Sequence, residues 1–145
     1  MRWPARFKGG KRTDKIVSNM DVTATILEAV GIKVPGYMHS RSLLEFCREP
    51  QRSDWPEYTV AEHHGHGDQI TQRIIVGRRY KYVAALFDGD ELYDLHKDPF
   101  EQHNLVNSTD HRDIRDRLRS RIIKHIEKNE DEMAEKLAHA LKLGR

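Results

Sequence analysis

The spacing of apolar positions changes twice along the chain, and each spacing predicts a different kind of element. In the N-terminal part, apolar side chains recur every three or four residues over 21–30, which predicts a short helix. Gly31 fits the left-handed position that ends such a helix. A shorter helical stretch over 42–46 is expected to stop before Pro50.

From Tyr58 onward the apolar period changes to two, which is typical of strands with one buried face. Turn segments that contain glycine separate four such stretches, so the pattern predicts a small antiparallel meander. The four predicted strands are 58–62, 72–76, 80–84 and 91–94.

Helical spacing returns between Ile114 and Leu141, where apolar side chains step mostly by four residues. A strict four-residue step drifts around a helix by roughly 40° each time, so the buried face winds or the helix bends near 129–131. We expect this long terminal helix to pack on one face of the sheet. The predicted fold class is therefore α+β, with a short N-terminal helix in 1–57 and the sheet and terminal helix in 58–145.

Composition and charge narrow the range of partners. The 25 basic and 23 acidic side chains give a formal net charge of +2, a balance that does not call for a nucleic-acid partner. No apolar run approaches the roughly twenty residues of a membrane span, so no membrane partner is expected, and the cellular compartment stays open. Cys47 is the single cysteine, which excludes an internal disulfide. With 37% hydrophobic residues, the chain suits a thin layer that packs against something larger.

Several short motifs follow one another in a particular order along the chain. They are Trp3-Pro4, the helical segment 15–31, Ser42-Leu43, Gly77-Arg-Arg-Tyr-Lys-Tyr82, Glu91-Leu-Tyr-Asp-Leu95, Asp98-Pro99 and Asn104-Leu105. In this order and spacing, they resemble the C-terminal region of the type I sulfatases, enzymes of the alkaline-phosphatase superfamily. The departures are single residues: Ala5, Ala24 and Ser40 stand where the family usually has glycine, proline and glycine.

This resemblance implies hydrolysis of a sulfate ester or sulfamate at a calcium site, by a formylglycine made from the cysteine of a Cys-x-Pro-Ser-Arg motif. That motif does not occur in these 145 residues. The single cysteine opens the sequence Cys47-Arg-Glu-Pro50, and we interpret it as a thiol at a helix end. In the family, the calcium ligands and the sulfate-binding lysines lie upstream of the Trp-Pro segment. The chain itself is therefore expected to carry no catalytic residue and no cofactor.

Two partners follow from the same resemblance. One is the missing N-terminal catalytic domain, against which this chain would pack while helping to form the substrate cleft. The other is the substrate of the parent enzyme, which would be a sulfated small molecule or glycan.

Candidate chemistry is concentrated in the segment Glu62-His63-His64-Gly65-His66-Gly67-Asp68, which holds three imidazoles and two carboxylates. We expect His63, His64 and His66 to lie at the edge of the parent enzyme's cleft and to donate hydrogen bonds to an anionic substrate. Adjacent His63 and His64 on a strand would point to opposite faces, which opposes joint ligation of a metal ion.

Three alternatives stay open at this point. The segment 62–68 could serve a non-catalytic metal-binding or interaction module. It could also be a polar surface turn without a binding role. Finally, the chain could be the equivalent part of a phosphate-ester hydrolase from the same superfamily.

Overall fold

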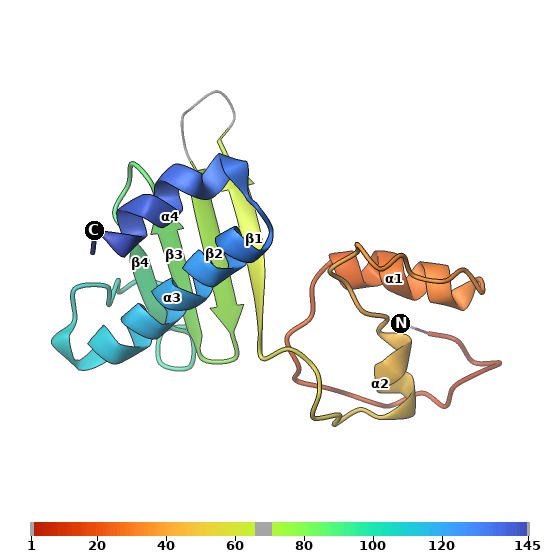
Figure 1. Cartoon of the computed structure of the whole chain (residues 1–145). Coiled ribbons are helices and arrows are strands. Elements are labelled where there is room, and N and C mark those ends of the chain that lie inside the picture. Colours follow the sequence, from red (N-terminus) through yellow and green to blue (C-terminus); the bar gives the residue numbers. More distant parts are fainter. Residues whose placement is uncertain (1, 66–70, 145) are drawn as a thin grey trace. The chain divides into compact units, whose positions relative to one another are not determined.

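The computed structural model describes residues 2–65 and 71–144 (Figure 1). The chain divides into two compact units, Met1–Glu57 and Tyr58–Arg145. The first unit carries two short helices, and the second contains a sheet and its covering helices. Within the described residues, no helix is both long and apolar enough to cross a bilayer.

The first unit contains helix α1, Met20–Ala29, and helix α2, Leu44–Arg48. Helix α1 ends as the sequence predicts, because Gly31 has a φ of 79° and the Ile32 N–H donates to the Leu27 carbonyl at 2.9 Å. Its bounds differ by one residue from the predicted range, and α2 starts two residues later than expected.

Helix α1 is attached to its own unit through its small and polar side chains. The Asp21 carboxylate accepts the Arg41 N–H at 2.9 Å, and the Thr25 hydroxyl accepts the Leu43 N–H at 2.8 Å. Ala24, between them on the helix surface, is fully buried. The side of α1 that faces the unit is therefore the less apolar one.

The second unit is built on four antiparallel strands in the order β1-β2-β3-β4, the meander that the period-two pattern predicts. Residues Ile75, Tyr82 and Leu92 lie side by side across three of the strands and are fully buried. The strands are β1 Tyr58–His64, β2 Thr71–Gly77, β3 Tyr80–Ala85 and β4 Glu91–Asp94.

Helices α3, Arg112–Lys128, and α4, Glu135–Lys142, lie across one face of this sheet (Figure 1). They pack Leu118, Ile122 and Leu137 against the buried strand residues, which makes this layer the core of the unit. The prediction of a long helix on the sheet is confirmed by α3.

The prediction that this helix continues to Leu141 is wrong. The helix ends at Lys128, and Glu130 adopts a positive φ of 49°, which reverses the chain before α4. The second apolar stripe therefore belongs to a separate helix that returns over the same face of the sheet. The bend expected near 129–131 is thus a complete break.

Candidate functional site at the histidine-rich end of strand β1

The histidine-rich segment begins inside the sheet and not in a loop. Strand β1 continues to His64 because His63 pairs with Gln72 and His64 pairs with Thr71 of β2. The expected strand end at Glu62 is therefore two residues too early. His66 lies outside the described residues.

Alternation along β1 separates the two described histidines. Glu62 and His64 project to the face that α3 covers, whereas His63 projects to the opposite face. This is the arrangement expected for adjacent histidines on a strand. The structure thus does not bring His63 and His64 together on one surface.

Glu62 lies at the centre of a cluster of cationic and imidazole side chains. Its carboxylate is 3.7 Å from His64 Nε2, 3.7 Å from Arg73 Nη2 and 3.9 Å from His125 Nε2. The Glu62 side chain is 48% exposed, so this cluster borders solvent at the edge of the sheet. The three contacts come from β1, β2 and α3.

Arg73 fixes one side of this cluster. Its side chain is fully buried, and it binds Asp131 through Nε–Oδ2 and Nη2–Oδ1 hydrogen bonds of 2.7 and 2.8 Å. Nη1 donates to the carbonyl of Gln72 at 2.8 Å. A paired and bonded guanidinium of this kind holds its position rigidly, so the neighbouring Glu62 faces a fixed positive charge.

The charges determine what the two faces can bind. A sulfate placed beside His64 would meet the Glu62 carboxylate, and the repulsion between the two anions would oppose binding. His63, on the other face, has no such neighbour among the described contacts. Of the two described histidines, His63 is therefore better suited to donate a hydrogen bond to an anion. On the side of Glu62, a hydroxyl group of a ligand could donate to the carboxylate and accept a hydrogen bond from an imidazole.

Metal binding finds no support in the described part of the chain. Within residues 2–65 and 71–144, no group of three histidine, cysteine, aspartate or glutamate side chains is arranged to hold a metal ion.

Sequence reasoning missed Arg73, His125 and Asp131. A charged residue at an inward position of β2, two residues before the buried Ile75, is a recognisable signal, because a buried guanidinium needs a carboxylate partner. The partner itself could not be identified from the sequence, since Asp131 lies 58 residues away. His125 occupies a helical position that no simple pattern distinguishes.

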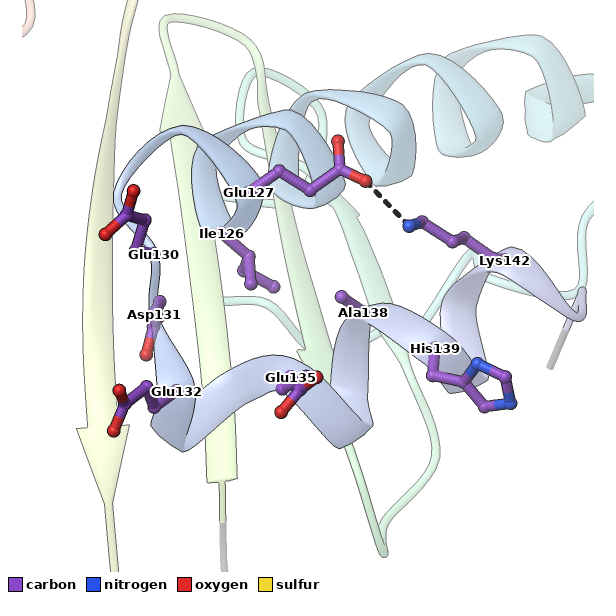
Figure 2. Close-up of a pocket in the computed structure, with 9 residues that line it drawn as sticks. All are labelled: Ile126, Glu127, Glu130, Asp131, Glu132, Glu135, Ala138, His139 and Lys142. Carbon is purple, nitrogen blue, oxygen red and sulfur yellow. Dashed lines mark ion pairs between the residues drawn. The ribbon is translucent and has the colours of Figure 1, made fainter.

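A hollow of about 440 Å³ lies between the end of α3 and α4 (Figure 2). Figure 2 shows the carboxylates of Glu130, Asp131 and Glu132 along the connecting turn, while Glu127 and Lys142 form a 2.6 Å ion pair between the helices. This concentration of carboxylates disfavours a sulfated ligand. The hollow is therefore not a candidate for the predicted substrate.

The fold and the ordered motifs define the class of protein: the chain is the C-terminal region of a sulfatase of the alkaline-phosphatase superfamily. Residues 1–128 match the family model described as N-sulphoglucosamine sulphohydrolase, C-terminal, and the chain belongs to that family. An arylsulfatase from Clostridium perfringens is 33% identical over 125 residues, which cover 86% of this chain and 25% of that protein.

Two further relatives extend the comparison. A delta 4,5-hexuronate-2-O-sulfatase from Bacteroides thetaiotaomicron is 33% identical, over 78% of this chain and 24% of that protein. A structure solved in complex with its substrate D-glucosamine-2-N,6-O-disulfate shares the fold, with a TM-score of 0.82 and 20% identity over 93% of this chain and 29% of that one. The chain spans about a quarter of the length of the curated relatives.

Proposed function

We propose that this chain is the C-terminal part of a hydrolase of sulfuric esters, that it lacks the nucleophile and the calcium ligands, and that it completes the substrate cleft of a larger enzyme. Membership of the sulfatase family and the quarter-length match to its relatives support this proposal. The parent substrate would be a sulfated small molecule or glycan, as the names of the relatives suggest for those proteins.

The observation that carries the proposal is that α1 turns its apolar side outward and its polar and small side chains inward. Val22, Ile26 and Val30 follow one another at four-residue spacing along the outer side of α1 and its C-terminal end, and they are 49, 58 and 66% exposed. The buried side holds Asp21 and Ala24. A helix normally hides its apolar side, so an uncovered apolar face indicates a missing neighbour. The N-terminal catalytic domain of the parent enzyme is the partner that would cover it.

The sulfatase nucleophile is not expected in this chain, because the Cys-x-Pro-Ser-Arg motif does not occur in its sequence. Its single cysteine, Cys47, lies in α2, and its main-chain carbonyl accepts a hydrogen bond from the Lys11 ammonium. The described residues also supply no metal-ligating group of three. Formylglycine and calcium are therefore assigned to the catalytic domain, together with the reaction steps that they support.

The role left for this chain in catalysis is to contact the substrate. His63, His64 and His66 are the residues proposed for it, with His63 directed to the face of the sheet that α3 and α4 leave open. An imidazole there would donate a hydrogen bond to a sulfate or to a sugar hydroxyl. His64, beside Glu62, would take the uncharged part of the substrate.

A chimeric enzyme tests this function directly. The 145-residue chain replaces the C-terminal quarter of the Clostridium perfringens arylsulfatase, and hydrolysis of an aryl sulfate is measured. We expect turnover by the chimera and none by the isolated chain or by the same arylsulfatase without its C-terminal quarter. A folded chimera that is no more active than the truncated enzyme would contradict the proposal, as would turnover by the isolated chain.

Zinc titration separates this function from that of a metal-binding module. Calorimetry on the isolated chain should show no tight one-to-one binding. A tight site that disappears in the His63→Ala/His64→Ala/His66→Ala variant would favour the module.

A further inference from the structure

A cavity of about 330 Å³ in the first unit is lined by cationic and aromatic side chains. Arg2, Lys8 and Lys11 supply the positive charge, and Trp3 and Phe7 supply the rings. None of the described residues that line this cavity carries a carboxylate, in contrast to those of the hollow between α3 and α4. The cavity in the first unit is thus lined by positive charge, whereas the hollow between α3 and α4 is lined mainly by negative charge.

The positive charge around this cavity comes from basic residues that cluster at the start of the sequence. Six of the 25 basic residues fall within the first fifteen positions, together with a single acidic residue, Asp14. The formal charge of the whole chain is only +2, so the remaining 130 positions carry a net negative charge. The potential around the cavity is therefore local, and it does not arise from a generally basic protein.

The cations of the cavity differ in how they are held. Lys11 donates to the main-chain carbonyls of Cys47 and Arg48, so its ammonium is fixed at the end of α2. Arg2 and Lys8 form no ion pair with any described residue, and both are exposed. Their donors therefore remain available to an anion that enters the cavity.

The aromatic rings give the cavity a rigid wall. Trp3 and Phe7 pack edge to face with their centroids 6.1 Å apart, and the Arg6 guanidinium lies 4.9 Å from the Trp3 ring centre. This stack keeps the Trp3 ring next to the cations. A sugar ring can lie on such an aromatic surface while its anionic substituents reach the neighbouring lysine and arginine.

We propose that this cavity binds a sulfated saccharide unit of a polysaccharide, at a site separate from the histidine-rich end of β1. The cavity has room for about one sugar ring with its substituents, whereas duplex DNA presents a regular row of phosphates that needs an extended basic surface. The site rests on the proposed function only for the choice of a sulfated sugar as ligand. It would keep a polymeric substrate attached to the enzyme.

Titration of the intact chain with a heparin oligosaccharide tests this site. We expect binding that weakens with salt and that changes the fluorescence of Trp3, since Trp55 is buried elsewhere in the unit. The Arg2→Ala/Lys8→Ala variant should bind about fivefold or more weakly, because two charged contacts are lost. Lys124→Ala/Lys136→Ala removes the same charge from exposed positions in the second unit and should change the affinity less than about twofold.

Further ligands decide what the cavity recognises. Desulfated oligosaccharide should not bind, inorganic sulfate should compete only at far higher concentration, and a DNA duplex should bind more weakly than the heparin fragment. Equal losses in the two variants, a fluorescence change that persists in Trp3→Phe, or DNA binding as tight as heparin binding would each overturn the proposal. These measurements need no turnover, so an inactive chimera leaves them intact and a negative titration leaves the proposed function intact.

Discussion

Asn104 occupies the position of a strand partner beside Leu92 at the free edge of β4. Its side-chain oxygen accepts the Leu92 N–H at 3.0 Å, and the N–H of the next residue, Leu105, donates to the Leu92 carbonyl at 2.8 Å. The same oxygen also accepts the Val106 N–H at 3.0 Å. The Asn-Leu pair that helps to identify the family thus closes the edge of the sheet.

Replacing Asn104 with alanine should destabilise the second unit. Three hydrogen bonds are lost, because the side-chain amide also donates to the Asp90 carbonyl at 3.2 Å. We expect a loss of roughly 1–3 kcal/mol in the free energy of unfolding, measured by urea denaturation. Asn107→Ala, a few residues away and exposed, is the matched control and should change stability by less than about 0.5 kcal/mol. Equal effects of the two changes would contradict the role given to Asn104.

Breaking the Arg73–Asp131 pair should cost more than breaking an exposed ion pair. Asp131→Ala leaves the fully buried Arg73 guanidinium without its carboxylate, so we expect a loss of about 3–5 kcal/mol. The control is Lys142→Ala, which removes the half-exposed pair with Glu127 and should cost less than about 1 kcal/mol. Thermal and urea unfolding measure both variants. A small loss for Asp131→Ala would mean that the two charges are not desolvated together.

The periodic pattern of apolar residues determines the elements in some parts of this chain and not in others. The β-meander was predictable because every strand has its own apolar alternation and every turn has its glycine. A bend near 129–131 was one of two expected alternatives, but the break after Lys128 was missed, since the positive φ of Glu130 has no residue signature such as glycine.

The candidate site was predictable only in part, for two separate reasons. His63 and His64 were found as a local cluster, but the partners of Glu62 come from β2 and α3 and depend on tertiary contacts. The exposed face of α1 has a different cause. Its apolar spacing predicts a buried face, yet Val22, Ile26 and Val30 are exposed in this unit.

Stability should decrease in acid partly through Asp94. The hydrogen bonds from Arg79 lower the pKa of this carboxyl group below its ordinary value, and its side chain is only 1% exposed. A carboxylate with a lowered pKa contributes stability above its unfolded pKa, and that contribution is lost as the pH falls through its folded value. We therefore expect the difference in unfolding free energy between the wild type and Asp94→Asn to be largest near pH 7 and to shrink below about pH 4.

Urea denaturation at several pH values measures this difference. The exposed Asp88 provides the control, because Asp88→Asn changes a carboxylate at the surface and should alter the unfolding free energy by less than about 0.5 kcal/mol. A difference for Asp94→Asn that grows in acid would have the wrong sign for a lowered pKa.

The outer face of α1 should matter to the assembled enzyme and not to the isolated chain. Ile26 is 58% exposed, so Ile26→Ser should change the unfolding free energy of the isolated chain by less than about 0.5 kcal/mol. In the arylsulfatase chimera the same change would place a hydroxyl in an apolar contact with the catalytic domain, and the midpoint of thermal unfolding should fall. Leu44→Ala, at a buried position of α2, should instead cost roughly 2–5 kcal/mol in both settings. If Ile26→Ser is harmless in an active chimera, this face is not the contact with the catalytic domain. If it destabilises the isolated chain as strongly as Leu44→Ala does, the face is covered within the chain itself.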